Sequence, residues 1–192
     1  MNPATLRAIL AHAAERPATL GTSRLICVDG PAGSGKTTLG DALAQAASYG
    51  DPDAVVVLHM DDFYEGWDGL TRGIADRLLR SLIAPLSRGR AARLATWDWH
   101  AAAWGPEVTV APAPLIVLEG VGSGALAYAE SITTLVWVDA PHEERMARGV
   151  ARDGASFAAH WESWAVQERD LFAVERTRSR AHLHVDGLGH LA

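Results

Sequence analysis

The chain has 192 residues, of which 48% are hydrophobic and 21% charged, and its formal net charge is −6 at pH 7. This length suits one domain with a sizeable core over 1–192. The acidic balance gives no global attraction for nucleic acid or an anionic membrane, so we expect neither as a partner. Cys27 is the only cysteine, which excludes an intrachain disulfide and fits a reducing compartment, so we expect a cytoplasmic protein.

Apolar runs alternate with helical patterns along the chain. An amphipathic helix is expected first, at about 3–16. The further expected strands are 23–30, 54–60, 115–119, 133–138 and 182–185, and the further expected helices are 36–48, 70–86 (ending near Pro85), 141–152 and 157–176. Strands rich in valine, isoleucine and leucine that alternate with helices are typical of a mostly parallel sheet with helices on both faces. The sequence therefore predicts an α/β fold with about five strands.

Residues 93–110 break this alternation. Apolar and polar residues alternate at both ends of the segment, around a connection that contains Gly105-Pro106. This pattern predicts an inserted β-hairpin, within a substrate-side insertion at about 64–112.

The segment after the first expected strand is a phosphate-binding loop. Residues 30–37, GPAGSGKT, match G-x-x-x-x-G-K-[ST] at every fixed position, with a strand before and a helix after. Backbone N–H groups and the helix N-terminus would hold phosphate oxygens. The residues assigned to a bound ATP are Gly30, Pro31, Ala32, Gly33, Ser34, Gly35, Lys36, Thr37 and Thr38. The alternative, a glycine-rich turn without a ligand, does not explain the lysine and threonine.

Lys36 is the only lysine, whereas the other sixteen basic residues are arginines. A slim stem with a compact charge suits a tight phosphate loop better than a planar guanidinium. The chain has no N-K-x-D motif for reading guanine, because Asn2 is its only asparagine, and it has no transporter-ATPase signature.

Four segments in order resemble the uridine kinase-like branch of P-loop small-molecule kinases, which includes phosphoribulokinase and bacterial pantothenate kinase. They are GPAGSGKTT (30–38), MDDFY (60–64), VLEGV (117–121) and RMARGVARD (145–153). The resemblance covers most of the chain between residues 23 and 153. It implies an ATP- and Mg²⁺-dependent transfer of a phosphoryl group to the hydroxyl of a small molecule.

The resemblance also implies roles for single residues. Asp61 would accept the proton of the acceptor hydroxyl and help to hold Mg²⁺, together with Thr37 and Glu119. A lid at about 141–156 would bring arginines to the phosphates: Arg145, Arg148 and Arg152. Of these, Arg148 and Arg152 are assigned a part in catalysis. The sequence departs from the family at Asp62 and Gly149, and the arginines could instead form a solvated face paired with Glu143 and Glu144.

The residues that would bind the phosphate acceptor are not marked by a specific motif. The candidates for contact with the acceptor are Asp61, Tyr64, Trp97, Trp99 and His100, since aromatic rings can stack on a base or a sugar face. The resemblance makes a nucleoside the first expectation. A nucleoside monophosphate, held by Arg72, Arg77 or Arg93, a sugar or a vitamin precursor are alternatives, as is an ATP-binding regulator without transfer chemistry.

Overall fold

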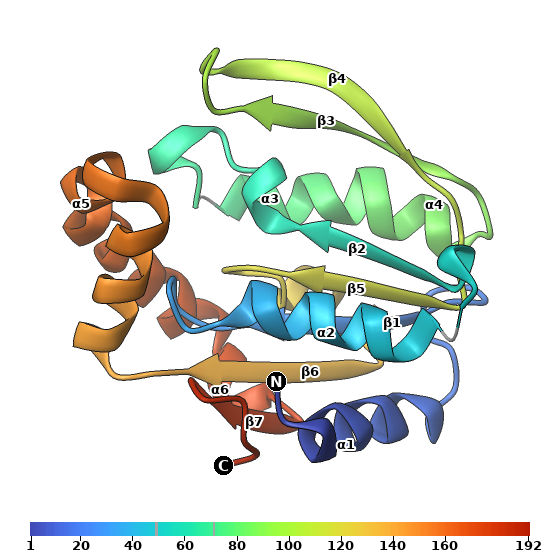
Figure 1. The fold of residues 1–192 in the computed structure, drawn as a ribbon. Helices are drawn as coiled ribbons and strands as arrows, with labels where there is room; N and C mark the ends of the chain where they lie inside the picture. The colour runs from blue at the N-terminus through green and yellow to red at the C-terminus, as the bar shows by residue number, and fades with distance from the viewer. Residues whose placement is uncertain (49, 71) are drawn as a thin grey trace.

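The computed structural model describes residues 1–48, 50–70 and 72–192, and of residues 72, 152, 153 and 155–157 it describes the backbone alone. Five strands form one sheet in the order β2-β5-β1-β6-β7, and every neighbouring pair in it is parallel. The strands are β1 (Arg24–Asp29), β2 (Val55–His59), β5 (Leu115–Glu119), β6 (Thr134–Asp139) and β7 (Leu183–Asp186). The α/β fold predicted from the sequence is confirmed (Figure 1).

The two faces of the sheet are covered by different helices. On one face, α1 (Pro3–Ala14) and α2 (Lys36–Ser48) pack against Ile26 and Val28 of β1. On the other face, the helical segment from α3 (Arg72–Leu78) to α4 (Ala84–Ser87) packs against Leu25 and Cys27. Successive side chains of a strand point to opposite faces, so the unbroken apolar run of β1 contributes to both cores.

The α3–α4 segment runs through Pro85 and ends at Ser87, close to the predicted end at about 86. The turn between the two helices, Leu79–Ile83, is π-helical, and the amide of Ala84 donates to the carbonyl of Leu79, five residues back. A proline lacks an N–H and crowds the preceding turn, and a widened turn relieves that conflict. The helical segment therefore reaches Ser87.

Helix α5 (His142–Glu175) lies at the carboxyl ends of the parallel strands (Figure 1). Its backbone leaves the helical conformation at Gly154, with φ of 70° and ψ of −149°. The lid helix and the helix that follows it are therefore two halves of one element with a break between them. The short α6 (Thr177–Arg180) then leads to β7.

The predicted hairpin is formed by β3 (Ala92–Asp98) and β4 (Ala103–Val110), which pair antiparallel and lie apart from the main sheet (Figure 1). The expected connection was wrong: Gly105-Pro106 lies inside β4, opposite an irregularity between Ala95 and Trp97. A proline fits a strand at such a bulge, where no ladder donor is needed. The true connection is the turn at 99–102.

In the part of the chain that the structure describes, no helix combines the length and the apolar character that crossing a bilayer requires.

Candidate active site

The phosphate loop connects β1 to α2. Gly30, Gly33 and Gly35 have φ of +145°, +75° and +103°, a region that side-chain-bearing residues rarely adopt. A Cβ at Gly33 would collide with the backbone of Arg145, whereas a Cβ at Gly35 would point into open space. Lys36 is only 7% exposed, and its Nζ donates to the Pro31 carbonyl at 2.9 Å. The loop thus folds closely over the Lys36 side chain and leaves free space beside Gly35. This arrangement fits a bound phosphate chain.

Thr37 and Glu119 meet beside the loop. Thr37 Oγ1 donates to Glu119 Oε1 at 3.1 Å, and His59 Nδ1 lies 2.6 Å from the same oxygen. The hydrogen bond with Glu119 raises the pKa of His59 above its ordinary value. Hydroxyl and carboxylate oxygens suit Mg²⁺, which usually keeps phosphate and water among its ligands. No set of three or more His, Cys, Asp or Glu side chains suited to a metal ion occurs among the described residues.

Asp29, the last residue of β1, is fully buried and ties the phosphate loop to the segment after β5. Its carboxylate accepts from the amides of Gly30 at 2.7 Å, Gly122 at 2.8 Å and Gly124 at 2.9 Å. Burial raises the pKa of Asp29 to about 6, against the opposing effect of these hydrogen bonds. The start of the loop therefore depends on a buried carboxyl group.

The lid arginines take different positions. Arg145 is mostly buried, donates to the carbonyls of Ala140 at 3.1 Å and Ala32 at 3.2 Å, and so contacts the phosphate loop. Arg148 is more exposed and pairs with Glu144 at 3.0 Å, the surface pairing that the sequence left open. The side chain of Arg152 lies outside the described residues.

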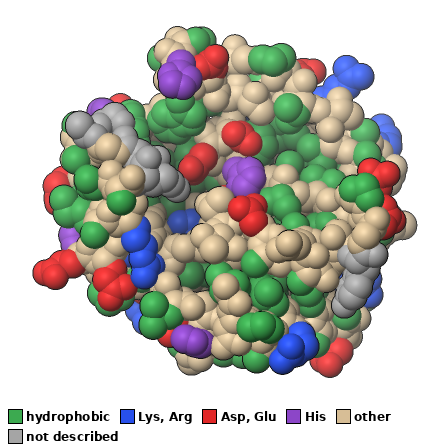
Figure 2. Space-filling model, viewed as in Figure 1, with side chains coloured by type: hydrophobic (Ala, Val, Ile, Leu, Met, Phe, Trp, Pro, Cys, Tyr) green, Lys and Arg blue, Asp and Glu red, His purple; other side chains and the backbone are tan. Residues whose placement is uncertain are grey.

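One cavity, of about 540 Å³, joins the loop to the expected acceptor region. On the face seen in Figure 2, acidic side chains and a histidine gather near the centre, beside hydrophobic ones. The residues that line the cavity are Ala32, Gly33, Lys36, Thr37, Asp61, Asp62, Tyr64, Trp67, Trp99, His100, Glu119, Gly120, Val121 and Trp164. Charged groups thus occur at the loop end and aromatic rings at the other, the acceptor end.

The aromatic rings at the acceptor end hold one another in place. Trp67 packs edge-on against Trp99 at 5.2 Å and against Trp164 at 5.9 Å, and it stacks on His160 at 4.7 Å between ring centres. The indole N–H of Trp99 donates to the Asp61 carbonyl at 2.9 Å. This hydrogen bond holds the hairpin turn beside Asp61, where we expect the acceptor hydroxyl.

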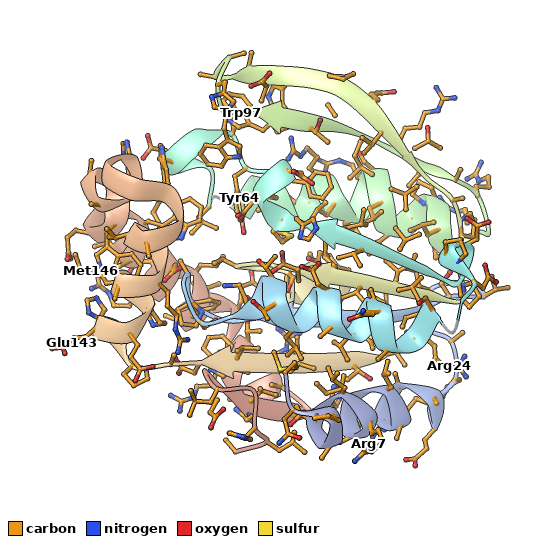
Figure 3. The ribbon with its side chains drawn as sticks, in the orientation of Figure 1. Arg7, Arg24, Tyr64, Trp97, Glu143 and Met146 are labelled. Carbon is orange, nitrogen blue, oxygen red and sulfur yellow. The ribbon has the colours of Figure 1, made fainter. Side chains whose placement is uncertain are left out.

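Trp97 does not line this cavity, although the sequence placed it with the acceptor residues. It extends from the hairpin (Figure 3) and packs edge-on against Trp104 at 5.1 Å. The carboxylate of the neighbouring Asp98 accepts hydrogen bonds from the amides of His100 and Ala101, and these bonds shape the turn. Alternation along a strand would place residues 97 and 99 on the same face, but β3 ends at Asp98 and Trp99 already belongs to the turn, so the two rings diverge.

Two of the three arginines expected to hold an acceptor phosphate, Arg77 and Arg93, are placed elsewhere. The guanidinium of Arg77 donates to the Phe63 carbonyl and lies 4.0 Å from the ring centre of Trp104. Arg93 is an exposed residue of β3, and the side chain of Arg72 lies outside the described residues. The described side chains therefore form no second anion site at the acceptor end.

A second cavity, of about 310 Å³, opens on the other side of the loop. Its lining includes Ser34, Gly35 and Thr38 of the loop, Arg148 of the lid, and residues 185–189, at the end of β7 and just after it. The hydroxyl of Ser34 is buried and has no hydrogen-bond partner there. The loop is thus accessible from two sides.

Sequence reasoning missed three residues at this site: His59, Trp164 and Glu168. For His59 a signal existed, because it ends β2 opposite Glu119 in the parallel register. Trp164 and Glu168 lie beyond the lid in sequence, and only the folding of α5 back onto the loop brings them to this site.

A parallel sheet with a phosphate loop between its first strand and the next helix defines a P-loop α/β protein. No protein-family model matches the sequence, and no curated protein matches it. Solved structures do match the fold.

A possible uridine kinase from Bacillus stearothermophilus is 21% identical, with a TM-score of 0.66, over 94% of this chain and 97% of that chain. A putative fructose transport system kinase from Silicibacter sp. TM1040 is 21% identical, with a TM-score of 0.61, over 92% and 94%. D-glycerate 3-kinase from Cryptococcus neoformans is 11% identical, with a TM-score of 0.53, over 98% and 95%. The chain therefore has the fold of P-loop small-molecule kinases, as the sequence resemblance predicted.

Proposed function

We propose that this protein is a kinase that uses ATP and Mg²⁺ to phosphorylate a hydroxyl group of a small molecule. The observation that carries the proposal is the shared cavity. It is lined by Lys36, Thr37 and Asp61 and by three tryptophans, of which Trp99 donates to the Asp61 carbonyl. Phosphoryl transfer needs a held phosphate chain and an oriented hydroxyl at a common point, and this arrangement supports both.

The phosphate loop and its neighbours fit a nucleoside triphosphate and magnesium. When bound, Mg-ATP supplies the phosphoryl group. Lys36 and the loop amides would hold its phosphates, while Thr37 and Glu119 would hold the metal. Asp61 would orient the acceptor hydroxyl and take its proton, and Arg145 and Arg148 would close the lid side and exclude water. The rest of the nucleotide would lie in the second cavity, beside Arg148 on the other side of the loop.

A nucleoside is the first acceptor to test, because flat aromatic walls suit a base. The names of the similar structures extend the test to a sugar and a hydroxy acid. A phosphorylated acceptor is less well supported, since Arg77 is bound to a carbonyl and a tryptophan ring.

The test is a screen of uridine and other nucleosides, fructose, other sugars, glycerate and vitamin precursors for acceptor-dependent ADP release, with the product identified by mass spectrometry. Each nucleoside is compared with its monophosphate in the same coupled assay. A phosphorylated hydroxyl supports the proposal. ATP binding without a product from any acceptor would support a nucleotide-binding regulator instead.

A further inference from the structure

Glu168 is a buried carboxylate that the proposed mechanism does not use. It lies in the second half of α5, beyond the break at Gly154, and is only 4% exposed. Burial raises its pKa above the ordinary value, while the nearby charges of Lys36 and Arg145 oppose that rise. A carboxylate is costly to bury unless hydrogen bonds and charges compensate it, so Glu168 needs partners of this kind.

The partners of Glu168 belong to the phosphate loop and to the lid. Its Oε1 accepts from the amide of Ala32 at 2.6 Å. Its Oε2 lies 3.9 Å from Nη1 of Arg145, and the same nitrogen donates to the carbonyl of Ala32 at 3.2 Å. The two halves of α5 therefore hold Ala32 from both sides, one half through the amide and the other through the carbonyl.

The same carboxylate oxygen also binds the acceptor end of the cavity. Oε1 accepts from the indole N–H of Trp164 at 2.9 Å. Trp164 lines the cavity and packs edge-on against Tyr64 at 5.2 Å and Trp67 at 5.9 Å. One oxygen atom thus joins the third residue of the phosphate loop to the aromatic wall that would face the acceptor.

We propose that Glu168 is a positioning residue that couples the two ends of the cavity. By binding Ala32 and Trp164 through one oxygen, it sets the distance between the loop that holds the donor and the wall that holds the acceptor. A nucleotide bound in the loop then changes the surroundings of Trp164. The inference rests on the proposed function only in requiring that a nucleotide binds in the loop.

The experiment uses the full chain labelled with 5-fluorotryptophan and follows the seven tryptophans by ¹⁹F NMR. The Trp164 resonance is assigned with Trp164→Phe, and Mg-ADP is titrated. We expect the wild-type Trp164 resonance to shift, and the shift to fall to less than about one third in Glu168→Ala, which lacks both bonds. Glu168→Gln keeps an accepting oxygen and should retain more than about half of the shift. Glu162→Ala removes an exposed carboxylate of the same helix and should behave as wild type.

If Glu168→Ala does not fold, Glu168→Met fills a similar volume without an accepting atom and carries the same expectation. A full Trp164 shift in the variant without an acceptor atom overturns the coupling. So does a wild-type protein that binds Mg-ADP without any shift of Trp164. A wild-type protein that binds Mg-ADP and shifts Trp164 but phosphorylates no acceptor leaves the coupling intact and refutes the proposed function alone.

Discussion

The two ends of the cavity are built in different ways. At the loop end, a short contiguous motif supplies the groups, and buried contacts with Asp29, Glu168 and Arg145 fix its backbone. At the acceptor end, the side chains come from three segments, represented by Trp67, Trp99 and Trp164, and mainly ring contacts hold them. We therefore expect the first arrangement to tolerate little change and the second to lose one ring at moderate cost. Substitutions at each end of the cavity test this contrast.

The largest effect is expected at the loop. Lys36→Ala should lower kcat/KM by about 10³-fold, because the compact buried charge that stabilises the phosphates is lost. Lys36 is the only lysine, so an acylating reagent followed by mass spectrometry gives a second measurement. Mg-ATP should protect this amine in the wild-type protein. Equal labelling of Lys36 with and without saturating Mg-ATP would remove it from the phosphate site.

Asp61 lies where the two ends meet, so its loss should separate binding from transfer. Asp61→Asn should lower kcat by at least about 10²-fold while the affinity for ATP stays near the wild-type value, because the proton acceptor is lost and the loop is intact. Calorimetric titration with ATP and steady-state kinetics measure the two quantities. Asp62→Asn, at the neighbouring cavity-lining carboxylate, is the matched control. Full turnover by Asp61→Asn would exclude the assigned role.

The buried Asp29 makes the loop end sensitive to pH. Its pKa is raised to about 6 from 3.8, so the folded protein binds this proton more tightly than the unfolded chain does. The free energy of unfolding should therefore fall as pH rises from about 4 to about 6, by up to about 3 kcal/mol.

Asp29→Asn should lack this part of the pH dependence, whatever its absolute stability. Asp139→Asn, at the end of the neighbouring strand β6, should retain it. Urea unfolding at several pH values between 4 and 7 measures the difference. A wild-type protein and an Asp29→Asn variant with parallel pH profiles would contradict the role of this carboxyl group.

The smallest effect is expected at the acceptor end. Trp99→Ala should raise the KM for the acceptor by about tenfold, since an aromatic contact contributes about 0.5–1.5 kcal/mol beyond its buried area. The KM for ATP should stay unchanged. Trp97→Ala is the control, because Trp97 packs against Trp104 outside the cavity. A larger loss of acceptor affinity in Trp97→Ala than in Trp99→Ala would reverse this assignment.

The same contrast explains what could be predicted from the sequence. The order of strands and helices and the phosphate loop follow from local patterns: apolar runs for the strands, and glycines with Lys36 and Thr37 for the loop. The hairpin was predicted, but its connection was not, because Gly105-Pro106 signals a turn and a bulge equally well. The helix predicted at 70–86 was found, but its π-helical turn at Leu79–Ile83 was not, because the sequence carries no clear signal for it.

Contacts between distant segments were not predicted from the sequence. The bond between His59 and Glu119 follows from the register of β2 and β5, which a strand-by-strand alignment of the sheet could have supplied. The bonds of Glu168 to Ala32 and Trp164 depend on how the second half of α5 folds back onto the loop. Helical spacing places Glu168 on the same face as the buried Trp161 and Trp164, unlike the exposed Glu162, but it does not show that this face meets the phosphate loop.

The central claim is that one cavity brings a phosphate donor and a hydroxyl acceptor together. The most direct measurement follows the label of [γ-³²P]ATP in the presence of each acceptor from the screen. The account predicts that, with at least one hydroxylated acceptor, the label appears in the acceptor as a phosphate ester, and that Asp61→Asn abolishes this transfer while still binding ATP. Label that appears only in inorganic phosphate with every acceptor, in a protein that binds ATP, would contradict it.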